Sequence, residues 1–144
     1  MQHVEMSIAA IREILAPIPA EEWIRTRFTD GRYRCCAVGH LQRLLSPNPE
    51  DYSHENCTDK SGNAERTNIR LKSMLFLTRL GVPNQGIAEV NNGECHLFTQ
   101  LTCKERVMKL LNMMCREEEY LLAREAERLK VLSTAQYVEE LVEA

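Results

Sequence analysis

Two adjacent cysteines, Cys35 and Cys36, begin a predicted helix and have the side chains needed for nucleophilic chemistry. The first turn of a helix stabilises a thiolate through its dipole and its free backbone N–H groups. Arg32 and Arg34 precede the pair and add positive charge. A thiolate formed there attacks an electrophilic carbon, which is the first step of thiol-dependent hydrolases and transferases. Cys36 is therefore the candidate nucleophile.

A cysteine nucleophile works with a base and with a group that orients the base. His96 is the candidate base, His40 is a second candidate, and Asn91 is the candidate orienting group. In the competing interpretation, both cysteines pack as small apolar side chains and Asn91 only makes a turn. Because such triads transfer poorly between folds, a hydrolase or transferase using Cys36, His96 and Asn91 is the alternative function, not the preferred one.

A metal site is the second chemistry to consider, because Cys36 and His40 are four residues apart and share one side of a helix. Further ligands of the type that zinc takes are His54, Cys57, Cys95 and His96. The chain has no Cys-x-x-Cys pair, and neighbouring residues of a strand point to opposite faces. We therefore expect no metal and no cofactor, with reduced cysteines in the core.

Arginines gather before the central helix and interleave with aromatic residues: Arg25, Arg27, Arg32, Arg34, Phe28 and Tyr33. Affinity for nucleic acid accumulates over many phosphate contacts, and the net charge is −3, so nucleic acid is not an expected partner. The patch suits an acidic protein surface or a small phosphorylated ligand, but a solvated charged edge is the favoured interpretation. The candidate binding residues are Arg32, Arg34, Cys35, His40 and Asn92.

These residues need a scaffold, and the hydrophobic pattern predicts one that is mainly α-helical. We expect a central helix over 35–45 that follows a short extended segment over 32–34, preceded by helices over 3–16 and 20–28. Residues 46–67 are almost free of aliphatic side chains and are predicted to form a long loop. A second buried helix follows over 69–80 and ends at Gly81. The central helix is expected to lie between this helix and one over 103–114.

The segment 87–98 is predicted to form a small β-hairpin, because Asn92-Gly93 favours a type I′ turn. Thr102 and Glu105 form a capping box that opens the last main helix. Together these signals predict one globular domain over 1–115.

Residues 116–144 are predicted to form a helical extension of that domain. Its apolar stripe continues through Leu121, Leu129 and Leu132, but Glu118 and Glu125 interrupt it. Burying those glutamates within one chain is costly without cationic partners. We therefore expect this extension, with a restart at Ser133-Thr134, to bind a protein partner or a second copy.

The composition is that of a globular protein, with 44% hydrophobic and 27% charged residues among 144. No apolar run reaches the roughly 20 residues needed to span a bilayer. The amphipathic N-terminus contains Glu5 and Glu13, unlike a secretory signal. The expected location is the cytoplasm, without membrane contact.

Three short motifs resemble a family of small bacterial and phage proteins, a domain of unknown function. They are Trp23 with Phe28, then Cys36-Ala37-Val38-Gly39 with Leu41, then 87–92 before a helix containing Val107 and Leu110. Within these motifs, His40 replaces the family's alanine, Val90 its tryptophan and Asn92 its aspartate. The resemblance covers 23–111 and implies an architecture rather than an activity. The preferred function is a cytosolic, non-catalytic protein-binding module of bacterial or phage type, possibly dimeric.

Overall fold

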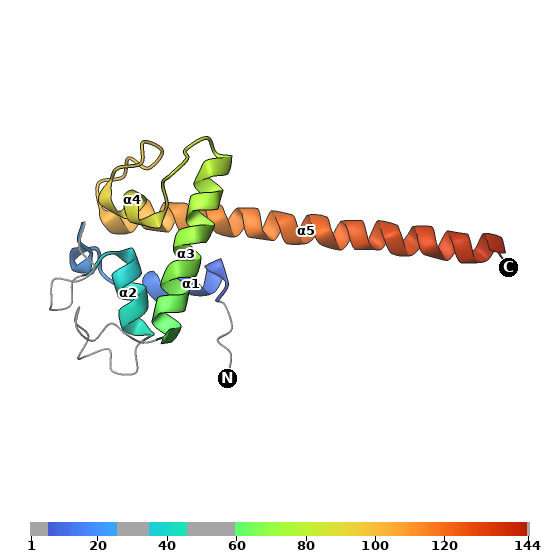
Figure 1. The fold of residues 1–144 in the computed structure, drawn as a ribbon, viewed down its shortest axis with the longest axis horizontal. Coiled ribbons are helices and arrows are strands. Elements are labelled where there is room, and N and C mark those ends of the chain that lie inside the picture. Colours follow the sequence, from blue (N-terminus) through green and yellow to red (C-terminus); the bar gives the residue numbers. More distant parts are fainter. Residues whose placement is uncertain (1–5, 26–34, 46–59, 144) are drawn as a thin grey trace. The chain divides into compact units, whose positions relative to one another are not determined.

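The computed structural model describes residues 6–25, 35–45 and 60–143 and is mainly helical, as the sequence predicts. In chain order its elements are α1 (Ile8–Leu15), the 3₁₀-helix η1 (Ala20–Glu22), α2 (Ala37–Leu44), α3 (Lys60–Arg79), α4 (Ile87–Asn92) and α5 (Cys103–Glu143) (Figure 1). The chain divides into two units, residues 1–114 and residues 115–144. The first unit contains the core and the second consists of the later part of α5.

Helix α2 is the centre of the first unit, because it packs against α1, α3 and α4. Val38 and Leu41 are buried, and so are Gly39 and His40 on the other side of the helix. Helix α3 is a main neighbour of α2, as expected, and α1 and α4 also pack against it.

Several helix boundaries differ from the prediction. Helix α1 begins later than expected, at Ile8, because the Ser7 hydroxyl caps it by accepting from the Ala10 amide. The predicted helix over 20–28 is reduced to the single turn η1, and residues 26–34 lie outside the described part of the chain. Helix α3 begins at Lys60, so the last part of the expected loop is helical. Residues 46–59 are not described.

The predicted β-hairpin is wrong: 87–92 is helix α4, and no hairpin occurs among the described residues. The Ile87 amide donates to the Ser73 hydroxyl of α3, and the Gly86 amide donates to the Glu89 carboxylate. At the other end, Gly93 has a φ of +78°. Its amide donates to the Val90 carbonyl, and the Glu94 amide donates to the Glu89 carbonyl. This pair of bonds is a Schellman motif, so Asn92-Gly93 ends a helix instead of turning a hairpin.

Helix α5 starts where the capping box predicts. The Thr102 hydroxyl accepts from the Glu105 amide and donates to the Glu105 carboxylate. The expected restart at Ser133-Thr134 does not occur, because the helix runs unbroken from Cys103 to Glu143. The Thr134 hydroxyl donates to the Lys130 carbonyl four residues earlier in the same helix.

Candidate functional site

Cys35 and Cys36 precede helix α2 rather than lying in its first turn. Cys35 is fully buried and forms an isolated parallel bridge with Trp23. Its amide donates to the Glu22 carbonyl, and its carbonyl accepts from the Ile24 amide. Cys36 is the N-cap residue of α2, with extended backbone. The two thiols are thus held by a backbone junction between the η1 segment and the central helix.

Asn91 joins three segments of the first unit from the end of α4. Its side-chain oxygen accepts from the Ala37 amide at 3.1 Å, which caps the first turn of α2. Its side-chain nitrogen donates to the Ile24 carbonyl at 2.9 Å and to the Asn92 side-chain oxygen at 3.2 Å. Asn91 is fully buried, and these bonds commit its amide group to holding α2, α4 and the Ile24 segment together.

His40 is also buried and bonded through both ring nitrogens. Nε2 lies 2.7 Å from the Glu22 carbonyl oxygen, and Nδ1 lies 3.4 Å from an Arg43 guanidinium nitrogen. A neutral ring satisfies both contacts if Nε2 donates to Glu22 and Nδ1 accepts from Arg43. The pKa of His40 is lowered to about 4, mainly by burial and to a smaller extent by the Arg43 charge, against the opposing effect of the hydrogen bond to the Glu22 carbonyl. His40 is therefore neutral near pH 7.

The environment of Cys36 favours the neutral thiol. Burial raises the pKa of Cys36, although the backbone amides of Val38 and Gly39 at the start of α2 act in the opposite direction. The nearby Cys103 thiol raises it further. The helix N-terminus is thus present, as the sequence predicts, but desolvation has the larger effect on the thiol. The thiolate fraction at neutral pH is correspondingly small.

His96, the first candidate base, lies in a different setting. It is exposed and lines a cavity of about 510 Å³ together with residues that include Arg25, Gly93 and Arg106. Among the described hydrogen bonds, none joins His96 to Cys36 or to Asn91. The structure therefore brings Cys36 and Asn91 to the same helix start without bonding His96 to them. The remaining candidates, Arg32 and Arg34, lie outside the described residues.

Arg106 is a central residue that the sequence analysis missed. It is 2% exposed, and its guanidinium donates to the carbonyls of Val90, Asn91 and Gln100 at 2.8–3.0 Å. The first two carbonyls end helix α4, where the helix dipole favours a cation. Its position three residues after Cys103 places it on the inner side of α5, and this spacing was the sequence signal that Arg106 is buried.

The second unit presents a different kind of candidate site, an apolar helix surface. Its large apolar side chains are all at least half exposed: Tyr120, Leu121, Leu122, Leu129, Val131, Leu132, Tyr137, Val138, Leu141 and Val142. At about 100° per residue, four of them, Leu121, Leu122, Leu129 and Leu132, form what we call face A. Tyr120, Val131, Val138 and Val142 form face B, about 135° away around the helix. One helix thus carries two apolar faces, and Tyr137 and Leu141 lie between them on the other side of the helix.

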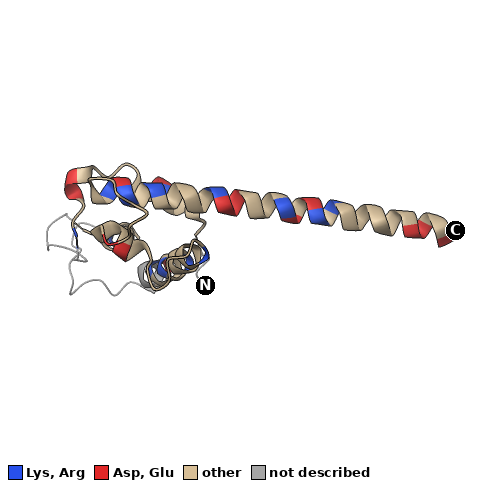
Figure 2. Ribbon diagram, turned by 90° about the horizontal axis from the view of Figure 1, so that it is seen from above, with Lys and Arg blue, Asp and Glu red and all other residues tan. Residues whose placement is uncertain are grey.

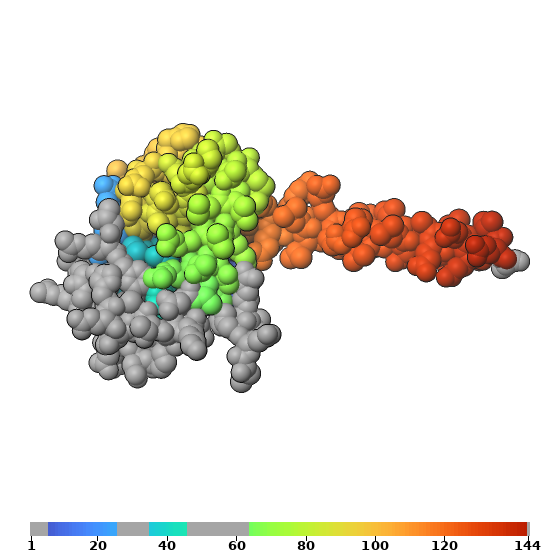
Figure 3. Space-filling view, viewed as in Figure 1, coloured from blue at the N-terminus to red at the C-terminus, as the bar shows by residue number. Residues whose placement is uncertain are grey.

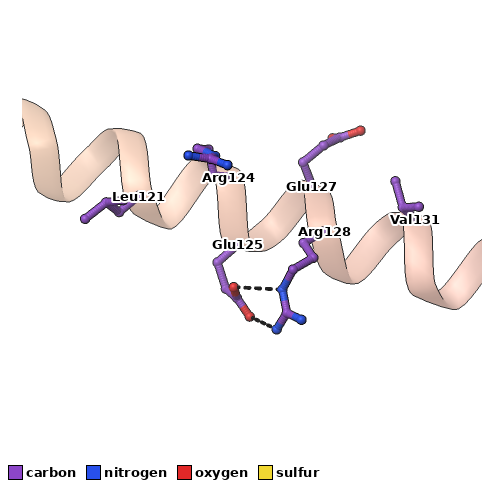
Figure 4. Close-up of a pocket in the computed structure, with 6 residues that line it drawn as sticks. All are labelled: Leu121, Arg124, Glu125, Glu127, Arg128 and Val131. Atoms are coloured by element: carbon purple, nitrogen blue, oxygen red, sulfur yellow. Dashed lines mark hydrogen bonds and ion pairs between the residues drawn. The ribbon is translucent and has the colours of Figure 1, made fainter.

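Between the two faces lies a hollow of about 540 Å³, lined by Leu121, Arg124, Glu125, Glu127, Arg128 and Val131 (Figure 4). Residues 121, 124, 125 and 128 have the i, i+3, i+4, i+7 spacing of a hole that receives a side chain from a neighbouring helix. Residues 124, 127, 128 and 131 repeat that spacing. Leu121 and Val131, from faces A and B, point to different sides of the helix. The hollow therefore has the geometry of two overlapping holes for helix packing.

The glutamate at the centre of face A is paired within its own helix. Arg128 donates to both carboxylate oxygens of Glu125, at 2.6 and 3.1 Å. This bond raises the pKa of Arg128. Glu125 thus has an adjacent cation without a second chain, which lowers the cost of placing face A against a neighbour.

Comparisons with protein-family models, with curated proteins and with solved structures find no match. The family resemblance stays a prediction, and the loss of the hairpin removes much of its basis. No helix in the described part of the chain has the length and apolar character required to cross a membrane.

Proposed function

We propose that this protein is a small, non-catalytic protein-binding module that acts through residues 116–143 of α5. The observation that carries the proposal is the exposed apolar surface of this segment, spread over faces A and B. An isolated helix is marginal in water unless it packs against another element. Helix-to-helix contact with another chain is the simplest way to cover such a surface.

The two faces also indicate how many neighbours the helix takes. A single partner helix covers one seam, as in a two-stranded coiled coil. Faces A and B are too far apart around the helix to share one seam, so complete burial requires two neighbouring helices. We therefore favour self-association into a bundle of more than two helices, with docking to a partner protein as the other form of the same function.

The charge pattern is consistent with contact to another chain. The last turns of α5 carry Glu139, Glu140 and Glu143 and no basic residue, as the colouring of Figure 2 shows. Carboxylates at the C-terminal end of a helix oppose its dipole. A neighbouring chain that brings cationic groups to this end would remove the conflict.

The non-catalytic part of the proposal rests on the first unit. The polar side-chain atoms of Asn91 and His40 make hydrogen bonds to backbone groups and to Arg43. Burial raises the pKa of Cys36, which favours its neutral thiol. These groups stabilise the junction around α2, which is a sufficient role for them.

Sedimentation velocity on the full chain over a wide concentration range tests the proposal. Leu121→Glu with Leu129→Glu disrupts face A, and Val131→Glu with Val138→Glu disrupts face B; each pair should lower the sedimenting mass. Ala123→Glu with Ala126→Glu is the matched control, because both positions are exposed, lie between the faces and add the same charge. The control pair should sediment as the parent does.

Truncation after Cys115 tests the competing possibility, in which the helix stabilises the core of its own chain. We expect the thermal transition of the first unit to survive this truncation. A full chain that stays strictly monomeric and loses most of its thermal stability on truncation would show that the helix belongs to the core of one chain.

A further inference from the structure

Among the side chains that the structure describes, Arg106 is the one buried lysine or arginine. Its guanidinium donates to the carbonyls of Val90, Asn91 and Gln100 and to the Cys103 sulfur. None of these partners is a carboxylate, and the end of a helix as short as α4 supplies only a partial negative charge. Buried cations are rarely left without an opposite charge. The described residues therefore give Arg106 hydrogen bonds but no full counter-charge.

A second guanidinium converges on the same place beside Gly93. A Cβ atom at residue 93 would lie 3.0 Å from an Arg25 guanidinium nitrogen and 3.5 Å from an Arg106 guanidinium nitrogen. Because residue 93 is glycine, with a φ of +78°, no side chain occupies this space. Arg25 has an interaction partner of its own, so it contributes charge here rather than a full set of free donors. Two positive charges thus flank the space next to the Gly93 backbone.

The same three residues, Arg25, Gly93 and Arg106, line the cavity of about 510 Å³. This volume is in the range of small-molecule sites. Residues that follow α4, drawn in gold, lie on the surface of the first unit in Figure 3. The acidic residue of the lining, Glu94, is exposed, and its carboxylate makes none of the described hydrogen bonds or ion pairs. The cavity is thus open to solvent, and its own acid does not bond to either arginine.

We propose that this cavity binds a small phosphorylated molecule, with the phosphate beside Gly93 between the Arg25 and Arg106 guanidiniums. A phosphate monoester has a charge of about −2 near neutral pH, which two guanidiniums match better than the single charge of a carboxylate would. Guanidinium N–H groups also fit the geometry of phosphate oxygens. The ligand would supply the counter-charge that the described residues do not give Arg106.

The exposure of the lining sets the strength of the contact. Arg25 and Glu94 are exposed, so solvent and salt screen their charges. Glu94 repels an anion, and this repulsion lowers the affinity further. We therefore expect weak binding that decreases as salt rises. All these residues lie in the first unit, so the inference does not depend on the proposed function of residues 116–143.

Isothermal titration calorimetry on the full chain tests the inference with inorganic phosphate, phenyl phosphate and benzoate. Sodium chloride at the same ionic strength is the blank, because it reproduces general screening. We expect saturable binding of both phosphates above this blank. Phenyl phosphate should bind about tenfold or more tightly than benzoate, since benzoate has the same ring but one charge.

Variants locate the site. Arg25→Gln should weaken phenyl phosphate about tenfold or more, because it removes one guanidinium. Glu94→Gln should strengthen it about twofold, because it removes a like charge, and a gain of this kind does not arise from unfolding. Arg70→Gln is the matched control for Arg25→Gln, because Arg70 is exposed on α3 and does not line the cavity. It should bind as the parent does, and circular dichroism checks that each variant stays folded.

Four outcomes would overturn the inference. Neither phosphate binds above the chloride blank; benzoate binds as tightly as phenyl phosphate; folded Arg25→Gln binds as the parent does; or Glu94→Gln binds no more tightly than the parent. A phosphoserine peptide that binds more tightly than phenyl phosphate, and needs Arg25 to do so, would assign the site to a phosphorylated protein segment instead.

Discussion

Replacing Asn91 with alanine tests whether this residue holds the first unit together. The substitution removes the acceptor of the Ala37 amide at the start of α2 and the donor to the Ile24 carbonyl. It keeps the helix α4 backbone intact, because alanine is a good helix former. The effect therefore reports the loss of the side-chain bonds and not of the helix.

The expected loss of stability follows from those two bonds. A buried backbone group that loses its partner costs about 1–3 kcal/mol. The Ala37 amide is buried, whereas the contact with Ile24 is only partly buried. We therefore place the loss in the free energy of unfolding at about 2–4 kcal/mol. Because domains of this size are stable by about 5–15 kcal/mol, this loss is a large part of the total.

Urea unfolding followed by tryptophan fluorescence measures this loss in the first unit. Trp23 is the only tryptophan, is buried, and donates from its indole nitrogen to the Ile18 carbonyl. Asn112→Ala is the control, because Asn112 is exposed and accepts a hydrogen bond from Arg12. The control should change stability by no more than about 0.5 kcal/mol. An Asn91 loss equal to that of the control would refute the argument.

Three further predictions concern buried or constrained groups of the first unit. Because the pKa of His40 falls from 6.5 when unfolded to about 4 when folded, its contribution to stability is complete above pH 6.5. It should be lost as the pH falls towards 4, by about 3 kcal/mol in all; His40→Gln should flatten this pH dependence, and an unchanged slope would contradict it. Because burial raises the pKa of Cys36, iodoacetamide should label this thiol more slowly at pH 7.5 in the folded protein than in urea. Peptide mass mapping measures the labelling, and rapid labelling of the folded protein would support the alternative function, a thiol-dependent enzyme. Gly93→Ala should destabilise by about 1–3 kcal/mol and more than Gly81→Ala, since both residues have positive φ but only a Gly93 Cβ would meet other side chains; equal losses by urea unfolding would argue against that crowding.

The helical character of the fold could be predicted because it rests on local signals. The capping pair Thr102 and Glu105 and the glycine after α3 act within a few residues, and the structure places helix ends beside both. Helix α4 shows where local signals fail. Asn92-Gly93 fits a type I′ turn and a helix end equally well, because each needs a residue with positive φ. The choice depends on the Ser73 hydroxyl, which caps α4 from a helix distant in sequence.

The pKa of Cys36 is a second property that local sequence signals do not determine. The sequence places Cys36 close to a helix start, and that position alone predicts a lowered pKa. Whether the amides or the desolvation have the larger effect depends on how deeply the thiol is buried, which is set by tertiary packing around α2. Arg106 was missed for a related reason. A lone arginine in a helix usually faces solvent, whereas the carbonyls at the C-terminal end of α4 and the Gln100 carbonyl make the burial of Arg106 favourable.

The structure changes the argument by which the glutamates of residues 116–143 support a partner-binding helix. Burial of Glu125 was expected to be costly without a cationic partner, and Arg128 of the same helix supplies one. Both residues are more than half exposed, so the pair itself contributes little to stability. Its consequence is that face A can approach a neighbour without leaving Glu125 as an unpaired carboxylate. A variant Arg128→Ala should therefore weaken association through face A more than Arg124→Ala does, and sedimentation velocity at matched concentrations distinguishes the two. Equal effects of the two substitutions would show that the Glu125–Arg128 pair has no part in the contact.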